Sequence, residues 1–352
     1  MTETTPENAA LWLPKRGARF ELGPAPYTAP AAGEVVVRVR AIAVNPIDGM
    51  PGFAYRLILP WLNFPAVVGS DVAGVIVEVG PGVTRLRPGD RVVGAAGGIE
   101  QNRNRAAEGA FQRYVVLKQS MTATLPDDLS FEQAAVLPLA VSTAASGMFQ
   151  HDHLALPLPT IDAEDRRETV LVWGGSTSVG SNAIQLARHA GYRVVATASP
   201  RNFDYLRSLG ATATVDYHNR TAADELIDAI GDSPLAGTLA IGNGSLKPTL
   251  TIASAVPGSR RIASAQPALL TRVSSLLRRH KGIQVSSIWG GSLKDNEVGP
   301  GIYVDFLPAA LAKGTYQAVP NHVIVGAGLD KIPDALDQLR KGVSAKKLVV
   351  TI

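Results

Sequence analysis

The residues best suited to chemistry form a glycine- and hydroxyl-rich stretch, VWGGSTSVG, at positions 172–180. It follows the apolar run ETVLVW and precedes the amphipathic run SNAIQLARHAG, a pattern that predicts a strand, a tight loop and a helix. In a dinucleotide-binding loop of this kind, three glycines make the turn, admit the pyrophosphate and let the helix pack on the strand. Gly175 and Gly180 stand at the first and third positions, whereas Thr177 stands at the second.

A side chain at the second position should hold the backbone further from a pyrophosphate. The hydroxyls of Ser176, Thr177 and Ser178 could instead hydrogen-bond a phosphate at the positive end of the following helix, which continues with Val179. The alternative is an ordinary strand–turn–helix with small polar residues. The alternation of strands and helices around the loop favours the dinucleotide site.

The end of the next predicted strand indicates which dinucleotide would bind. There an acidic residue would bind the ribose 2′-hydroxyl of NAD. The sequence ATASPRNF offers Ser199, Arg201 and Asn202 and no carboxylate, while Asp204 falls on the following helix. Hydroxyl and guanidinium groups suit a 2′-phosphate, so we expect NADPH as the cofactor.

The surrounding elements predict an α/β fold. Residues 34–94 contain runs rich in β-branched residues, and 130–150 has helical periodicity beginning after Ser130. Residues 151–168 are predicted to form a surface loop. From 168 onward strand-like and helix-like segments alternate, which predicts a doubly wound parallel sheet.

Composition narrows the class of protein. The chain has 352 residues, 46% of them hydrophobic, no cysteine and a net charge of +4. Two domains are expected, with no disulfide and no thiolate metal site. No run reaches the ~20 apolar residues of a membrane span, and no signal peptide is evident, so we expect a cytoplasmic protein. The only dense basic cluster, at 278–281, ends a predicted helix before a glycine, and nucleic-acid binding is not expected.

Three longer segments carry a resemblance to a known family. VVGSDVAGVIVEVGPGVTRLRPGDRVVG (67–94), AVNPIDG (43–49) and the run from AIQLARHAG to TVDY (183–217) resemble the medium-chain dehydrogenase/reductase superfamily over nearly the whole chain. Zinc-dependent members use a cysteine ligand and a G-H-E motif, where this chain has Ser70 and Asp71. The resemblance is therefore to the zinc-independent branch of quinone oxidoreductases and enoyl reductases. WGGSTSVG and SPRNFD are similar to fungal trans-acting enoyl reductases that partner polyketide synthases.

The resemblance implies a GroES-like, β-rich catalytic domain at 1–140, an inserted Rossmann domain at 141–305 and a return to the first domain at 306–352. The cofactor would lie in the cleft between domains. Asn45 and Thr143 would stand at the nicotinamide and substrate, Pro46 and Asp48 at the nicotinamide and cleft wall. The remaining cofactor contacts implied are Gly175, Ser176, Thr177, Ser178, Val179, Gly180, Ser199, Arg201, Asn202, Tyr217 and Ser344.

The chemistry expected without a Lewis acid is conjugate reduction, because an unactivated alcohol would lack the usual stabilisation of its alkoxide. Hydride addition to an enone, an enoyl thioester or a quinone needs only hydrogen bonds to the developing oxyanion. Tyr55 could protonate the α-carbon, or it could belong to an apolar substrate wall while water supplies the proton. The pair His151 and His153 lacks further nearby ligands, so no metal site is expected.

Two other functions remain open. One is an accessory enoyl reductase recruited by a synthase through a carrier protein, although Gly49 and Met50 stand where such enzymes often carry a lysine. The other is a non-enzymatic NADPH-binding protein of the zeta-crystallin type. The family also implies a homodimer acting on a small-molecule substrate.

Overall fold

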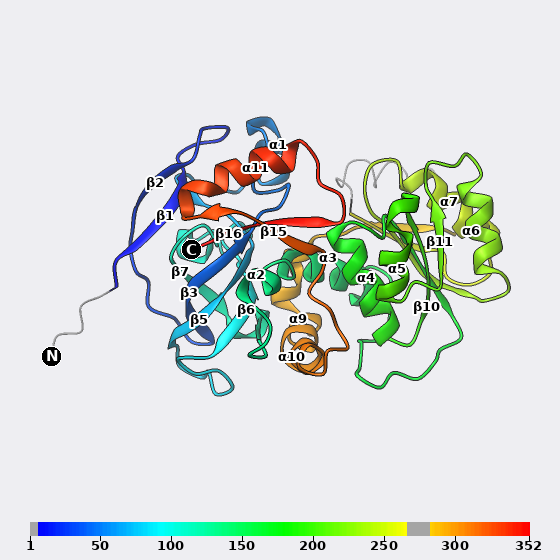
Figure 1. Ribbon diagram of the computed structural model, residues 1–352, viewed down its shortest axis with the longest axis horizontal. Coiled ribbons are helices and arrows are strands. Elements are labelled where there is room, and N and C mark those ends of the chain that lie inside the picture. Colours follow the sequence, from blue (N-terminus) through cyan, green and yellow to red (C-terminus); the bar gives the residue numbers. More distant parts are fainter. Residues whose placement is uncertain (1–5, 266–281) are drawn as a thin grey trace. The chain divides into compact units, whose positions relative to one another are not determined.

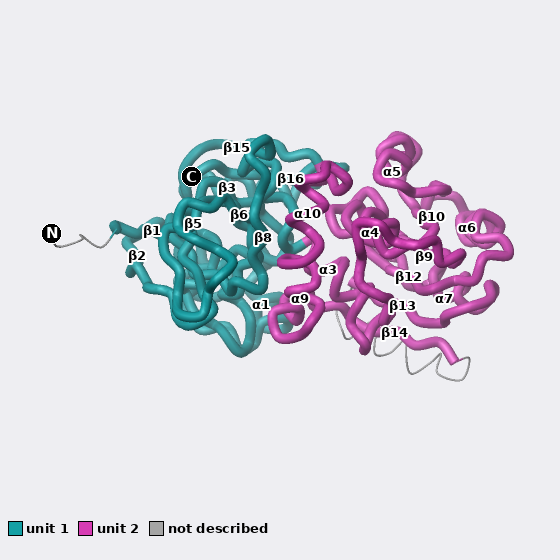
Figure 2. Tube along the Cα trace, turned by 90° about the horizontal axis from the view of Figure 1, so that it is seen from below, with its two compact units in different colours: residues 1–139, 321–352 teal, residues 140–320 magenta. Residues whose placement is uncertain are grey.

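The computed structural model describes residues 6–265 and 282–352. Two compact units divide the chain: residues 1–139 with 321–352 form unit 1, and residues 140–320 form unit 2. Figure 2 colours them separately. The basic cluster at 278–281 and its helical pattern lie outside the described residues. None of the described helices has the length and apolar character needed to cross a bilayer.

Unit 2 is built on a six-stranded parallel sheet, which confirms the doubly wound fold. Its strand order is β11-β10-β9-β12-β13-β14, so β9 and β12 are neighbours although two strands separate them in sequence. This neighbouring pair is the topological switch point at which such sheets bind ligands. The strands are β9 (Thr169–Trp173), β10 (Arg193–Ala198), β11 (Ala213–Asp216), β12 (Leu235–Ala240), β13 (Arg261–Ser264) and β14 (Gln284–Ser287).

Helices connect the strands of unit 2 and bury their apolar faces on the sheet (Figure 1). Leu226 of α6 and Ile252 of α7, for example, pack in one cluster with Leu171 of β9. The helices of this unit are α3 (Pro138–Phe149), α4 (Ser178–His189), α5 (Phe203–Leu209), α6 (Ala222–Ile230), α7 (Leu246–Ala255), α9 (Val298–Pro300) and α10 (Leu307–Ala312).

Unit 1 contains the β-rich part of the chain. One sheet has the order β15-β16-β3-β5-β6-β8 with β7 also paired to β3, and a second has the order β2-β1-β4. The strands are β1 (Asn8–Leu13), β2 (Glu21–Ala25), β3 (Glu34–Ala43), β4 (Ala66–Val67), β5 (Asp71–Val79), β6 (Arg91–Ala95), β7 (Tyr114–Lys118), β8 (Thr122–Thr124), β15 (Asn321–Ala327) and β16 (Lys346–Thr351). Its helices are α1 (Gly52–Ile58), α2 (Phe131–Ala134) and α11 (Ile332–Arg340).

The helical pattern at 130–150 forms two helices and not one. Ser130 caps α2 in a capping box with Gln133, as its position before the apolar pattern predicts. The helix stops before Pro138, which lacks an N–H and disfavours helical backbone at Leu137. The chain starts again as α3 at Pro138 itself.

The return to unit 1 begins at Asn321, whereas the sequence placed it at 306. Residues 306–320 stay in unit 2 because they bond to α4. The Tyr316 hydroxyl donates to Asn182 Oδ1 over 2.7 Å, and the backbone N–H of Gln317 donates to Gln185 Oε1 over 2.8 Å. The sequence pattern of residues 306–320 gives no sign of these hydrogen bonds to α4, because the segment is largely apolar.

Candidate functional site

The loop after β9 is a tight turn fixed to β10. Gly174 has φ +87°, and its N–H donates to Thr197 Oγ1 over 2.9 Å. The N–H of Gly175 donates to Thr197 O over 2.8 Å. The left-handed residue of the turn is therefore Gly174, although the sequence assigned the turn to Gly175. Gly175 instead permits close packing, since a Cβ there would lie 2.7 Å from Leu206 Cδ2.

Thr177 is the N-cap of α4. Its Oγ1 accepts from the N–H of Gly180 over 3.0 Å and donates to Gly174 O over 2.8 Å. Gly180 packs the helix on the loop, because a Cβ there would meet Gly174 O at 2.2 Å. The threonine that departs from the three-glycine pattern thus closes the loop on itself, with its hydroxyl used for this cap.

Several donors at the start of α4 are left for an anion. Ser178 and Val179 occupy the first helical positions, where backbone N–H groups have no intrahelical partner. Within the described residues no hydrogen bond is formed by the hydroxyls of Ser176 and Ser178, which are half-buried. Open N–H groups, hydroxyls and the positive end of the helix dipole together fit a pyrophosphate.

A second glycine loop, which the sequence reasoning missed, follows β12. Gly242 and Gly244 have φ +87° and +79°, with open space where a Cβ would stand. Because β9 and β12 are adjacent and parallel, the two loops leave the same edge of the sheet. The signal in the sequence was the run IGNGS after an apolar segment.

The residues expected at the adenosine end gather at the ends of β10 and β11. The Ser199 hydroxyl donates to the Tyr217 hydroxyl over 3.4 Å, and Tyr217 is 42% exposed. Arg201 is exposed and Asn202 half-buried in the turn that follows Ser199. Asp204 points to solvent and pairs with Arg207 at 3.0 Å. No carboxylate therefore stands directly after β10.

In unit 1, Asn45 belongs to a buried polar cluster. Its Nδ2 donates to Asp71 Oδ2 over 2.9 Å, and its Oδ1 accepts from Lys347 Nζ. Lys347 also lies 2.9 Å from Asp71 Oδ2, while Asp71 Oδ1 accepts from the N–H of Leu139. Lys347 is 5% exposed and Asp71 0%. Asp71 thus holds the start of β5 to Asn45, Leu139 and Lys347. The sequence reasoning missed Lys347.

Asp48 lies beside this cluster with an unusual environment. Its Oδ2 accepts from the N–H of Asn45 over 2.8 Å, but among the described residues its buried Oδ1 has no hydrogen-bond partner. Burial, reinforced by the Asp71 carboxylate, raises the pKa of Asp48 to about 7. Tyr55 is buried too, and its hydroxyl donates to the backbone oxygen of Asp48 over 2.7 Å. Burial also raises the pKa of the Tyr55 phenol.

The remaining predicted residues are placed as follows. Pro46 and Ser344 are exposed in unit 1. Thr143 is half-buried on α3 in unit 2, where a Cβ at Gly290 would lie 2.7 Å from its Oγ1, so the glycine leaves room beside the hydroxyl. Gly49 packs against Leu336 of α11. A Cβ added to Gly49 would lie 3.2 Å from Leu336 Cδ2.

The histidine pair does not converge on one point. The His153 ring is buried and its Nδ1 lies 2.7 Å from Ser286 Oγ, whereas the His151 side chain is 91% exposed. Burial lowers the pKa of His153. In the described part of the chain, no group of three or more His, Cys, Asp or Glu residues could hold a metal ion.

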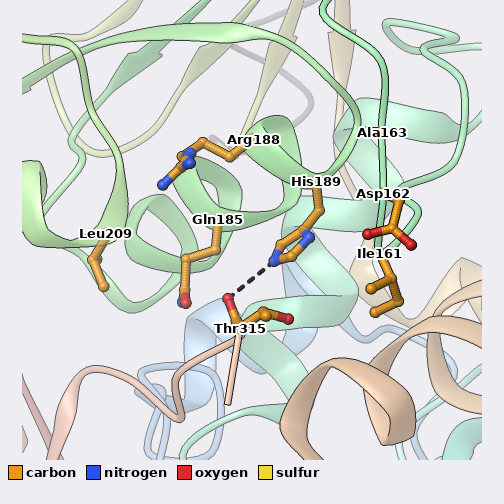
Figure 3. Close-up of a pocket in the computed structure, with 8 residues that line it drawn as sticks. All are labelled: Ile161, Asp162, Ala163, Gln185, Arg188, His189, Leu209 and Thr315. Carbon is orange, nitrogen blue, oxygen red and sulfur yellow. Dashed lines mark hydrogen bonds between the residues drawn. The ribbon is translucent and has the colours of Figure 1, made fainter. Parts of the chain in front are cut away.

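A cavity of about 450 Å³ in unit 2 lies apart from these loops (Figure 3). Arg188 and His189 of the last turn of α4 line it, and His189 Nε2 lies 3.0 Å from Thr315 O. Because a 12-residue helix is about 18 Å long, this cavity is at the opposite end of α4 from the loop after β9.

Known proteins resemble both units. The alcohol dehydrogenase GroES-like domain matches residues 31–127, and a family described as zinc-binding dehydrogenase matches 178–250. The chain is 43% identical to the dehydrogenase pigH of Monascus ruber, with 99% of this chain and 100% of the relative covered. It is 36% identical to the trans-enoyl reductase himH of Aspergillus japonicus, with coverage of 98% and 97%. The quinone oxidoreductase of Coxiella burnetii shares the fold, with a TM-score of 0.71 at 23% identity over 99% and 100% of the two chains.

Proposed function

Because the chain belongs to the medium-chain dehydrogenase/reductase family, a family of oxidoreductases that use a nicotinamide cofactor, we propose that it is an NADPH-dependent, zinc-independent reductase of activated carbon–carbon double bonds. The observation that carries the proposal is the capped loop at 174–180, with its open donors at the switch point of the sheet. Ser199 and Tyr217 supply the second half of the argument, since hydroxyls stand where an NAD-specific site would place a carboxylate.

The residues present fit such a dinucleotide. The first N–H groups of α4 and the hydroxyls of Ser176 and Ser178 would hold the pyrophosphate. Ser199, Arg201 and Tyr217 would hold the 2′-phosphate. Pro46, Asp48 and Ser344 remain proposed contacts of unit 1.

Zinc independence is supported by the donor set. The chain has no cysteine, and Ser70 stands at the position of the family's histidine ligand. Asp71 is already neutralised by the Lys347 ammonium at 2.9 Å. A dication beside a buried ammonium would be repelled, so this cluster suits no metal.

The reaction proposed is a conjugate reduction. When bound, the dihydronicotinamide supplies a hydride to the β-carbon of the conjugated substrate. The Thr143 hydroxyl would donate a hydrogen bond to the carbonyl oxygen as negative charge develops there. One proton then adds to the α-carbon, which gives the saturated carbonyl compound. The Tyr55 hydroxyl already donates a hydrogen bond to the backbone oxygen of Asp48, so we assign the proton added to the α-carbon to water.

An accessory enoyl reductase is a second candidate, favoured by the similarity to a trans-enoyl reductase over nearly the whole chain. Gly49 weighs against a side-chain contact at that position, because it has no side chain and a Cβ there would be crowded by Leu336 at 3.2 Å. A carrier-bound enoyl thioester that is reduced much faster than the same thioester on a small thiol would support this candidate.

The proposal is tested by titrating the protein with NADPH and NADH and following absorbance at 340 nm with an enone, an enoyl thioester and a quinone. Tighter binding of NADPH and its oxidation by an enone or enoyl thioester are expected. Ser199→Asp should reverse the cofactor preference, and Thr143→Val should lower kcat with little change in cofactor affinity. Binding without turnover across the panel would favour the non-enzymatic alternative and overturn the proposal.

A further inference from the structure

Two neighbouring strand ends bring four polar side chains together in unit 2. Ala198 of β10 pairs with Asp216 of β11 in the parallel register, so Ser199 and Tyr217 leave the sheet side by side. Their hydroxyls are 3.4 Å apart. The next residue, His218, turns back so that its ring lies 4.0 Å from the Tyr217 ring at an angle of 32°.

Asp216 fixes the orientation of the His218 ring. Its Oδ1 accepts from the His218 backbone N–H over 3.0 Å and lies 2.7 Å from His218 Nδ1. The proton on Nδ1 is thereby committed to the carboxylate. Nε2 forms no hydrogen bond within the described residues, and the side chain is 59% exposed. The ring therefore presents Nε2 to solvent beside two hydroxyls.

The charges of this arrangement depend on one another. A carboxylate at a strand end would repel the 2′-phosphate of NADPH. It could instead accept a hydrogen bond from the free ribose hydroxyl of NADH. Here the backbone N–H and the ring of His218 lower the pKa of Asp216, so the carboxylate stays ionised. With Nδ1–H on this carboxylate, an imidazolium ring would present its Nε2–H as the donor to an anion.

We infer that His218, oriented by Asp216, binds the ribose phosphate monoester of the cofactor together with Ser199 and Tyr217. Asp216 is then a positioning residue for His218 and makes no contact with the ribose. The inference rests on the proposed NADPH preference and deepens it by naming a donor that would act on the phosphate in addition to Arg201.

The test uses adenosine fragments, so that the result is independent of turnover. Dissociation constants are measured by calorimetry for adenosine 2′,5′-bisphosphate and for 5′-AMP, which differ only in the phosphate at issue. Adenosine 3′,5′-bisphosphate is the third probe, because coenzyme A carries its monoester at that position. We expect the 2′,5′ isomer to bind more tightly than either of the other two.

His218→Phe keeps an aromatic ring against Tyr217 and removes the donor. It should weaken binding of the 2′,5′-bisphosphate about tenfold, as expected for a hydrogen bond between charged groups, and leave 5′-AMP within about twofold. His151→Phe, at another exposed histidine of unit 2, is the control and should change nothing.

Asp216→Asn tests whether the carboxylate acts by orienting His218 or by repelling the phosphate. In the wild-type background it should weaken bisphosphate binding, because His218 loses its orienting carboxylate. In the His218→Phe background it should tighten binding, since only the repulsion is removed. Tighter bisphosphate binding by the single Asp216→Asn variant, or an equal loss of both ligands in His218→Phe, would overturn the inference.

The outcomes separate this inference from the proposed function. A wild-type protein that binds 5′-AMP as tightly as the 2′,5′-bisphosphate would refute the NADPH preference and the role of His218 together. A clear preference that survives His218→Phe would refute the role of His218 alone. Stronger binding of the 3′,5′ isomer would assign the site to coenzyme A and contradict the inference.

Discussion

At the scale of single residues, Thr177 shows how one side chain can serve the loop in another way than glycine. Its hydroxyl bonds to both ends of the turn, at Gly174 and Gly180. A glycine would let the backbone approach the pyrophosphate more closely, whereas threonine stabilises the start of the helix whose N–H groups would hold it. The departure from the three-glycine pattern thus has a structural reason.

Thr177→Ala should therefore destabilise the start of α4. The expected loss is about 1 kcal/mol, the usual contribution of an N-cap hydroxyl. Hydrogen exchange of the Gly180 amide should accelerate most, since its acceptor is removed. Thr177→Ser retains the hydroxyl and should exchange nearly as slowly as the wild type; equal acceleration in both variants would contradict the capping role.

Asp48 gives a prediction about pH. Its pKa is about 7 in the folded protein and ordinarily 3.8, so between about pH 4 and pH 7 the folded state holds a proton that the unfolded state has lost. Stability linked to this group is complete below pH 4 and declines as pH rises to 7. Asp48→Asn removes the linkage. The free energy of unfolding of Asp48→Asn minus that of the wild type, measured by urea titration, should rise by about 2 to 4 kcal/mol from pH 4.5 to pH 8. A difference that does not change with pH would disprove the linkage to Asp48.

At the scale of elements, ion pairs hold the long loop between β6 and β7 in unit 1. Arg103 bonds to Glu34 at the start of β3 and, over 2.7 Å, to Glu108 within the loop. Both carboxylates are 3% exposed. Burial alone would raise the pKa of Glu34, but hydrogen bonds from Arg103 and the Ala31 N–H outweigh it and lower the pKa.

Arg103→Met should leave two buried carboxylates, for which Arg105 is the remaining ion-pair partner among the described residues. A loss of about 3 kcal/mol in the free energy of unfolding at pH 7 is expected, because a buried charge loses its partner. The depressed pKa of Glu34 means that its stabilising contribution is present above pH 4.5 and is lost in acid. The effect of the substitution should accordingly shrink below pH 4. Arg105→Met, at a more exposed arginine, should cost less, and a larger loss there would contradict this ranking.

Much of the element structure could be predicted from local patterns. The switch from an apolar run to an amphipathic one located β9 and α4, and the alternation that follows gave the parallel sheet. The break at Pro138 was present in the sequence but was overridden by the helical periodicity around it. The turn at Gly174 could not be distinguished from one at Gly175, because both positions are glycine and only the backbone geometry separates them.

At the scale of the whole molecule, the chain leaves unit 1 after residue 139, forms unit 2 and returns at residue 321. The cluster around Asp71 depends on this return, since Lys347 is 302 residues from Asn45. Such a contact has no local signature, which is why the sequence pointed to Asn45 but not to Lys347, which donates to Asn45 and pairs with Asp71. Tyr205, whose hydroxyl donates to Ser181 Oγ next to the loop after β9, was missed for the same reason.

The two adjacent lysines of β16 provide a matched test of this cluster. Lys347→Met should lower the free energy of unfolding by about 3 to 5 kcal/mol, because the buried Asp71 carboxylate loses its cation. Lys346→Met, at an exposed position, should lie within about 0.5 kcal/mol of wild type. Similar losses in both variants, measured by urea denaturation, would show that the buried ion pair does not matter to stability.

The late arrival of β16 has a consequence for synthesis on the ribosome. Residues 140–320 leave the ribosome as a complete unit, whereas residues 1–139 emerge with the carboxyl end of β3 unpaired on one side, because β16, which pairs with residues 41–43, is made after unit 2. Until β16 is made, that unpaired end and the uncompensated Asp71 carboxylate are exposed to chaperones and to other nascent chains. A premature stop codon between positions 321 and 347 would therefore leave unit 1 unfinished while unit 2 is whole.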